Sequence, residues 1–189
     1  MQEPKKSHLL AAKRILRYVQ GTIDFGILFP KGKGEIEEKL VAYSDSDWCG
    51  DKSDRKSTAR YIFFYGGAPI SWSSSKEPVV ALSSCEAEYI AASEAACQAV
   101  WLDALMKELQ VEHLNKVKLL VDNKSAIDLA KHTTVHGRSK HIDKDGAKGG
   151  PTETRFHYLR EQVSKEKLEI EHCGTEIQFA DILTKALKL

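Results

Sequence analysis

The sequence predicts an α/β fold: a mixed five-stranded sheet with helices on its faces. Strand-like segments crowd residues 40–73, a long helical pattern follows over residues 83–109, and strand and helix patterns then alternate to the end of the chain. The chain has 189 residues, of which 42% are hydrophobic, so we expect one compact domain with an appendage.

Residues 1–38 form the predicted appendage and residues 39–189 the main domain. Ser7–Val19 has apolar residues at helical spacing, and Gly21 is expected to end this helix. Phe25–Phe29 is a short strand candidate before a flexible stretch containing Pro and Gly, which is the expected boundary.

Three strand candidates open the main domain, at Leu40–Ser44, Tyr61–Tyr65 and Ile70–Ser73. The short Gly-containing connection between the last two predicts a hairpin, so an antiparallel arrangement is expected for all three. Aromatic residues alternate along one face of the second strand. We expect that face, and also Trp48 and Trp72, to pack in the core.

A long helix over Ser83–Leu109 follows, opened by a capping box in which Ser83 pairs with Glu86. Val117–Val121 is apolar and comes after a helix, so it should lie parallel to its neighbour in the sheet. The remaining expected elements are a helix over Ser125–Lys131, a loop over His132–Glu153, a helix over Arg155–Lys165, a strand over Leu168–Cys173 and a helix over Phe179–Leu187.

Charge and cysteine content exclude several classes of protein. Lys and Arg total 28 and Asp and Glu total 27, so neither a basic nucleic-acid arm nor an acidic tail dominates. No apolar run approaches the roughly 20 residues of a membrane helix, and the four cysteines form no CxxC pair. We therefore expect a reduced, intracellular protein without a membrane segment, a disulfide framework or a structural zinc site.

Four carboxylates fall at places where a site could form. Asp45 and Asp122 each follow a strand, and parallel neighbouring strands bring such residues to one edge of the sheet. Glu88 lies about 50° from the centre of its helix's apolar stripe, where a carboxylate is costly unless it is paired or bound to a cation. Asp181 either joins them or caps the last helix. Ordinary surface acids are the alternative for all four.

Converging carboxylates without basic partners repel one another, and hard divalent cations relieve that repulsion. Oxygen-only ligands suit Mg²⁺ or Mn²⁺, and two such ions about 4 Å apart support phosphodiester hydrolysis. The residue pattern therefore suggests a metal-dependent nuclease.

Eight segments carry a family resemblance: His8–Thr22, Tyr43–Trp48, Asp54–Thr58, Pro69–Ser73, Leu82–Tyr89, Val121–Ile127, Lys140–Asp143 and Ala180–Lys185. Together, and in this order, they resemble the ribonuclease H domain of copia-type LTR retrotransposon polyproteins, preceded by the tail of the reverse transcriptase region. The resemblance implies a ribonuclease H-like fold and hydrolysis of the RNA strand of RNA·DNA hybrids.

The resemblance also implies roles for single residues. It assigns two Mg²⁺ ions, which Mn²⁺ can replace, to Asp45, Glu88, Asp122 and Asp181. It gives His172, which lies nine residues before Asp181, a catalytic role in proton transfer or product release. An exposed histidine at a strand end is the alternative.

The chain departs from the family at three points. Arg60 stands where the family usually has Gly, and we expect it to disturb or bulge the second strand. Lys144–Glu153 interrupts a stretch that is continuous in the family, and this Gly-rich decapeptide is expected to be an inserted flexible loop that the fold tolerates. No Tyr-x-Asp-Asp signature of a polymerase site appears, so residues 1–38 are expected to be a truncated connection segment.

Substrate contacts are expected beside the carboxylates. Asn123 and Ser125 are placed to meet 2′-hydroxyls across the minor groove of the hybrid, and helix capping is the alternative for both. Arg138 and Lys140 belong to the densest basic stretch, which either contacts phosphates or forms a solvated loop.

The first hypothesis is a Mg²⁺-dependent endoribonuclease that serves retrotransposon reverse transcription beside the reverse transcriptase domain of the same polyprotein. The alternative is a non-catalytic nucleic-acid-binding remnant, in which Arg60 or the insert misplaces the site. Another nuclease of the same fold, such as a DNA strand-transferase, is a weaker alternative. An intracellular, cytoplasmic location is expected, within a retroelement particle if the chain is part of an active element.

Overall fold

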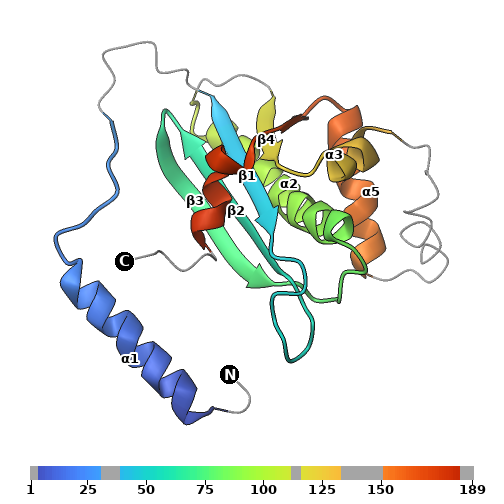
Figure 1. The fold of residues 1–189 in the computed structure, drawn as a ribbon. Coiled ribbons are helices and arrows are strands. Elements are labelled where there is room, and N and C mark those ends of the chain that lie inside the picture. The colour runs from blue at the N-terminus through green and yellow to red at the C-terminus, as the bar shows by residue number, and fades with distance from the viewer. Residues whose placement is uncertain (1–3, 31–38, 112–115, 133–150, 184–189) are drawn as a thin grey trace.

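The computed structural model describes residues 4–30, 39–111, 116–132 and 151–183. Its centre is a five-stranded sheet with the order β3-β2-β1-β4-β5 (Figure 1). The strands are β1 (Leu40–Ser46), β2 (Thr58–Tyr65), β3 (Ala68–Lys76), β4 (Val117–Val121) and β5 (Leu168–His172). The first three are antiparallel, β4 runs parallel to β1, and β5 runs parallel to β4. The predicted mixed sheet is confirmed.

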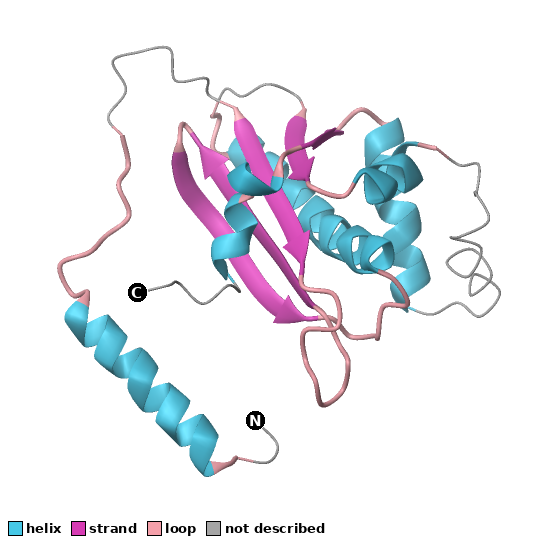
Figure 2. Cartoon of the chain, viewed as in Figure 1, coloured by secondary structure: helices cyan, strands magenta, loops and turns pink. Residues whose placement is uncertain are grey.

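Helices cover one face of this sheet, and a short 3₁₀ segment lies on the other (Figures 1 and 2). The long helix α2 (Ser84–Glu108) packs on β1, β2 and β4, and α3 (Lys124–Lys131) and α5 (Pro151–Ser164) pack against α2. The 3₁₀ helices η2 (Thr175–Ile177) and η3 (Phe179–Leu183) follow β5, and η3 contacts β1 and β2.

The two faces of the sheet differ in their contents because side chains alternate along each strand. On the α2 side, Phe63 is fully buried, and Tyr61 and Tyr65 pack partly buried against the same core, so the expected core face of β2 is confirmed. On the other side, the rings of Tyr43 and Phe179 contact each other with centroids 5.0 Å apart. This contact helps to fix η3 over the β1–β2 pair.

The expected core positions of the two tryptophans are wrong. Trp48 is 50% exposed and Trp72 is 51% exposed. The indole N–H of Trp48 donates to the carbonyl oxygen of Ala81 at 3.1 Å, so its polar end is anchored while its ring stays half in solvent. Trp72 lies on β3, the edge strand of the sheet, whereas η3 contacts β1 and β2. This position fits its exposure.

Several predicted element boundaries need correction. Phe25–Phe29 forms no strand: its side chains are exposed, and no described strand pairs with it. Helix α5 begins at Pro151, inside the expected loop, since proline suits the first helical turn. The described part of the last predicted helix, Phe179–Leu183, is a 3₁₀ helix and not an α-helix, and residues 184–189 lie outside the described residues. Of the predicted insert, residues 144–150 also lie outside them.

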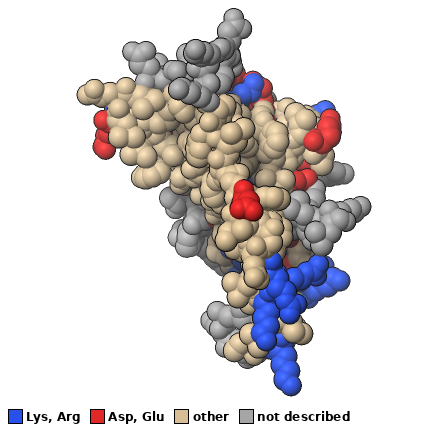
Figure 3. All heavy atoms as spheres, turned by 90° about the vertical axis from the view of Figure 1, so that its left-hand side faces the viewer, with Lys and Arg blue, Asp and Glu red and all other residues tan. Residues whose placement is uncertain are grey.

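Helix α1 (Lys6–Gly21) confirms the predicted N-terminal helix and stands apart from the sheet (Figure 1). None of its residues is buried. Figure 3 shows Lys and Arg side chains gathered at the end of the molecule where this helix lies. Its apolar side chains are exposed as well, and they are Leu9, Leu10, Ile15, Leu16, Tyr18 and Val19.

Two further findings bear on the class of protein. All four cysteines are free thiols. Among the described residues, no helix has the length and apolar character that crossing a bilayer requires.

Candidate metal centre

Two carboxylates stand side by side at one edge of the sheet. Asp45 belongs to β1, and Asp122 directly follows β4. Ser44 pairs with Val121 in the parallel β1–β4 ladder, so the next residue of each strand reaches the same edge. The expected convergence of these two side chains is confirmed.

Glu88 reaches the same place from α2. The Ser83 hydroxyl caps this helix by accepting from the backbone N–H of Glu86, and the Glu86 carboxylate accepts from the backbone N–H of Leu82 at 2.7 Å. Glu86 is therefore used by the cap, as predicted. Glu88 is only 6% exposed, which confirms that it lies on the buried side of the helix. Its Oε1 accepts from the backbone N–H of Ser46 at 3.1 Å, which fixes the side chain beside the end of β1.

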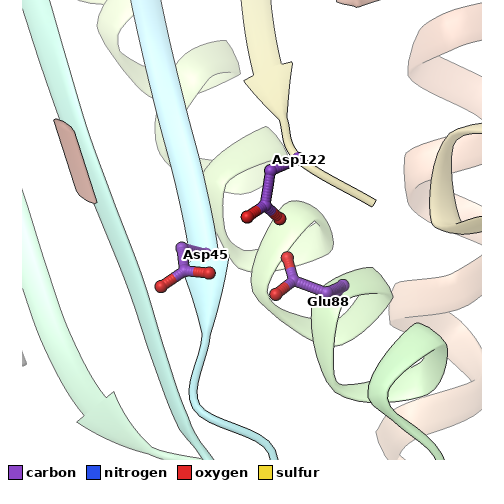
Figure 4. Close-up of side chains that lie close together, drawn as sticks. All are labelled: Asp45, Glu88 and Asp122. Carbon is purple, nitrogen blue, oxygen red and sulfur yellow. The ribbon is translucent and has the colours of Figure 1, made fainter. Parts of the chain in front are cut away.

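Figure 4 shows the three carboxylates of Asp45, Glu88 and Asp122 turned toward one another. One oxygen of each lies within 4.8 Å of the others. Burial raises the pKa of Glu88, and the charges of Asp45 and Asp122 raise it further. Burial also raises the pKa of Asp45. Glu88 and Asp45 are therefore held where their negative charges are poorly tolerated.

This cluster fits a hard divalent cation. Its ligand atoms are carboxylate oxygens, which Mg²⁺ and Mn²⁺ prefer. The Oε2 atom of Glu88 is buried and has no hydrogen-bond partner among the described residues. A buried, unpaired carboxylate oxygen is costly unless a cation meets it. Asp45, Glu88 and Asp122 could together hold such an ion.

Asp181 approaches Asp45 from the opposite face of the sheet, where η3 lies. The segment is anchored by the buried Gln178, whose Nε2 donates to the carbonyl oxygen of Ser44 at 2.9 Å and whose Oε1 accepts from the backbone N–H of Ala180 at 3.3 Å. A hydrogen bond with Asp181 contributes to the raised pKa of Asp45. Asp181 thus joins Asp45 but not the group that Glu88 and Asp122 complete.

Arg60 is itself part of the site, and no motif in the sequence predicts this direct contact with the carboxylates. Strand β2 runs through Arg60 without interruption, and the irregularity in its pairing lies between Phe63 and Phe64, so the expected disturbance at Arg60 is wrong. Arg60 stands directly opposite Asp45 in the antiparallel β1–β2 ladder. Its Nη1 lies 2.7 Å from Asp45 Oδ2 and 3.7 Å from Asp181 Oδ1. A cross-strand register, invisible in the sequence, brings a cation against the central carboxylate.

A second residue that the sequence does not predict, the acid Glu77, lies just behind the site. It is 1% exposed, and its Oε1 accepts from the Ser46 hydroxyl at 2.9 Å. Burial raises the pKa of Glu77 to about 7. Ser46 therefore links two buried glutamates, since its hydroxyl donates to Glu77 and its backbone N–H donates to Glu88.

The other predicted residues are placed as follows. His172 is exposed at the end of β5, opposite Val121 and so close to the strand end that carries Asp122. The Asn123 side chain caps α3 by accepting from the backbone N–H of Ala126 at 3.1 Å, and Ser125 is exposed in the first turn of that helix. Arg138 and Lys140 lie outside the described residues.

Known relatives cover this chain from end to end. The retrovirus-related Pol polyproteins from transposon TNT 1-94 of Nicotiana tabacum and transposon RE1 of Arabidopsis thaliana are 38% and 40% identical to it over 187 residues, 99% of the chain. The chain spans only 13% and 12% of the length of these relatives. No family model matches the chain.

Among solved structures, LC11-RNase H1, isolated from compost by a metagenomic approach, superposes with a TM-score of 0.50. The match covers 77% of this chain and 92% of that protein at 18% sequence identity. At that identity the likeness concerns the fold alone, and it agrees with the strand order and directions of the sheet.

Proposed function

Because this chain belongs to the retrovirus-related Pol polyproteins of copia-type plant transposons and has the ribonuclease H fold, we propose that it hydrolyses the RNA strand of RNA·DNA hybrids with divalent metal ions. One observation carries the proposal: three carboxylates from β1, α2 and the end of β4 converge with ligand atoms within 4.8 Å of one another. The hybrid is the substrate that the ribonuclease H resemblance implies.

In this proposal each of the four carboxylates has its own place in the metal site. Asp45 is the central ligand, Glu88 and Asp122 complete the set on the α2 side, and Asp181 reaches Asp45 from η3. These carboxylates would hold the divalent metal, which would supply the Lewis acidity needed to activate a water and to stabilise the leaving oxygen of the phosphodiester. The chain's own contribution is to hold the four carboxylates rigidly, through the α2 cap and the Gln178 anchor. The products are a 3′-hydroxyl and a 5′-phosphate.

Residues around the carboxylates are proposed to contact the substrate or to assist proton transfer and product release. His172 is exposed beside the end of β4, which suits proton transfer or product release. Asn123 uses its Oδ1 for the cap of α3, so its contact with a 2′-hydroxyl would be made by the amide nitrogen. Ser125, Arg138 and Lys140 are assigned to substrate binding on the resemblance alone.

The reverse transcriptase domain is the proposed partner within the same polyprotein. In this proposal residues 1–38 are the tail of that domain and residues 39–189 are the ribonuclease H domain. The support is the exposed apolar side of α1, which has no buried residue and therefore offers a surface for a neighbouring domain. We propose that the protein acts in the cytoplasm, in a retroelement particle.

A cleavage assay tests the proposed activity. The full chain is incubated with end-labelled RNA·DNA hybrid in Mg²⁺ and then in Mn²⁺, beside duplex DNA and duplex RNA. We expect cleavage of the RNA strand in the hybrid only. Asp45→Asn should abolish it, whereas Asp128→Asn, which changes an exposed carboxylate on α3, should not. Cleavage that survives Asp45→Asn would contradict the assigned site.

A non-catalytic hybrid-binding domain is the second candidate, and Arg60 favours it because its guanidinium lies 2.7 Å from the central carboxylate. This candidate predicts that the hybrid is retained in a gel-shift assay while no cleavage appears with either metal. Such a result would replace the first proposal by the second.

A further inference from the structure

The two sides of Asp45 have different cationic partners. Toward α2, Asp45 faces Glu88 and Asp122, and their oxygens form the cluster that fits a divalent ion. Toward η3, Asp45 faces Arg60, whose Nη1 lies between Asp45 Oδ2 at 2.7 Å and Asp181 Oδ1 at 3.7 Å. The second side therefore already holds a positive charge.

That charge is built into the fold. Arg60 and Asp45 are directly opposed in neighbouring strands, so their side chains share one face of the sheet. That face is the one that η3 covers, and the Arg60 side chain is only 2% exposed. A guanidinium keeps its charge at every accessible pH. Once buried it must stay beside carboxylates, because a buried guanidinium without a partner is strongly destabilising.

The guanidinium of Arg60 also lies close to the oxygens that a second metal ion would need. Magnesium binds carboxylate oxygens at about 2.0–2.1 Å. An ion shared by Asp45 Oδ2 and Asp181 Oδ1 would lie about 2 Å from both oxygens, and Arg60 Nη1 already lies 2.7 Å from the first and 3.7 Å from the second. A divalent cation at that place would meet the positive charge of the guanidinium at short range, and the two would repel each other.

We infer that the guanidinium of Arg60 takes the place of one of two divalent ions, so that this chain binds a single ion, at Asp45, Glu88 and Asp122. Arg60 neutralises the Asp45–Asp181 side permanently, and the metal neutralises the other side when it binds. The inference deepens the proposed function and rests on it, because both assign a divalent ion to the Glu88 side.

The number of bound ions tests this directly. Mn²⁺ is titrated into the full chain, and binding is followed by calorimetry and by loss of the free Mn²⁺ signal in electron paramagnetic resonance. We expect one tight site in the native protein and two in Arg60→Gly. Arg55→Gly is the matched control: Arg55 is exposed and has a positive φ of 60°, which glycine adopts readily, so one site should remain.

Two further variants keep the inference testable if Arg60→Gly does not fold. Asp181→Asn should leave the Mn²⁺ affinity within about twofold of the native value, because Asp181 is paired with Arg60 and not with the metal. Glu88→Gln should weaken Mn²⁺ binding at least tenfold, the lower end of what altering a metal site's ligand environment does.

The outcomes separate this inference from the proposed function. Two ions in the native protein, or a large loss of affinity in Asp181→Asn, would overturn the inference and leave the proposed function standing. One ion in a folded Arg60→Gly would also overturn it. No Mn²⁺ binding in the native chain would overturn the inference, and if hybrid cleavage is absent as well, the proposed function falls with it.

Discussion

Asp45 divides the acidic site into two halves, and the repulsion between carboxylates is relieved by a different cation in each half. On the α2 side, Asp45, Glu88 and Asp122 meet with oxygens within 4.8 Å, and the Oε2 of Glu88 has no hydrogen-bond partner among the described residues. On the η3 side, Arg60 lies 2.7 Å from Asp45 and 3.7 Å from Asp181. One half needs a cation from solution, and the other carries its own.

The comparison shows that the two halves of the site affect the stability of the fold differently. A carboxylate cluster kept ready for a metal is destabilising while it is empty, because burial and mutual repulsion both oppose ionisation. A buried ion pair makes the fold depend on both partners, and it does not improve on a well-packed apolar pair. Substitutions in the two halves should therefore change stability in opposite directions.

The largest expected effect comes from the metal-binding half. Glu88→Gln should lower hybrid cleavage by more than about 100-fold, since altering residues around a metal already costs 10–100-fold. It should also raise the free energy of unfolding by about 1 kcal/mol without metal, because it removes a carboxyl whose ionisation the fold disfavours and keeps the Ser46 hydrogen bond. Cleavage and urea unfolding measure the two effects, with the exposed Glu108→Gln as control. Retained cleavage would contradict the assignment of Glu88.

The opposite half gives the largest expected loss of stability. Arg60→Gln leaves the buried Asp45 beside the partly exposed Asp181 without their cation, so we expect the free energy of unfolding to fall by about 3 kcal/mol. Urea unfolding in the presence of a chelator measures this, and Arg55→Gln, at an exposed loop position, controls for the loss of an arginine. A loss below about 1 kcal/mol would mean that the two halves do not differ in the way described.

The part of the site that the sequence predicts is the part set by short-range periodicity. Helical spacing alone places Glu88 on the buried side of α2, and the position of Asp45 and Asp122 after two strands places them at one sheet edge. Arg60 could not be predicted in this way, because its role depends on the register that sets it opposite Asp45. That register is fixed by pairing between segments some fifteen residues apart, and a slip of one residue would turn Arg60 to the other face.

The same contrast between local pattern and long-range strand pairing holds for the fold. Strands β1 to β5 are predicted in type and order, since each pairs with a neighbour that its pattern anticipates. Phe25–Phe29 has an equally strand-like composition but no described strand beside it, and it stays extended and exposed. Strand propensity describes a fit to a sheet surface, so it predicts a strand only where a partner strand exists.

The third prediction concerns Glu77, the buried acid next to the Glu88 half, and tests whether the fold also disfavours its ionisation. Burial raises the pKa of Glu77 from 4.5 to about 7, so the folded chain binds a proton more tightly than the unfolded chain. Titration of Glu77 should therefore lower the free energy of unfolding by roughly 3 kcal/mol as the pH rises from about 4.5 to 7. Glu77→Gln should flatten this fall, and the exposed Glu108→Gln should not. Parallel pH profiles for the native chain and Glu77→Gln would contradict the raised pKa.

The smallest expected effect concerns how α2 presents Glu88. The Ser83 hydroxyl accepts from the backbone N–H of Glu86 at 3.2 Å, two residues before Glu88. Ser83→Ala should lower the free energy of unfolding by about 1 kcal/mol, the usual cost of an N-cap. Ser84→Ala, at the exposed next position, should change it by less than about 0.5 kcal/mol. Because only the Glu88 half is attached to α2, fraying of this helix should weaken Mn²⁺ binding and leave the Arg60–Asp45 pair in place. Equal effects of the two serine substitutions would show that the cap does not position the metal ligand.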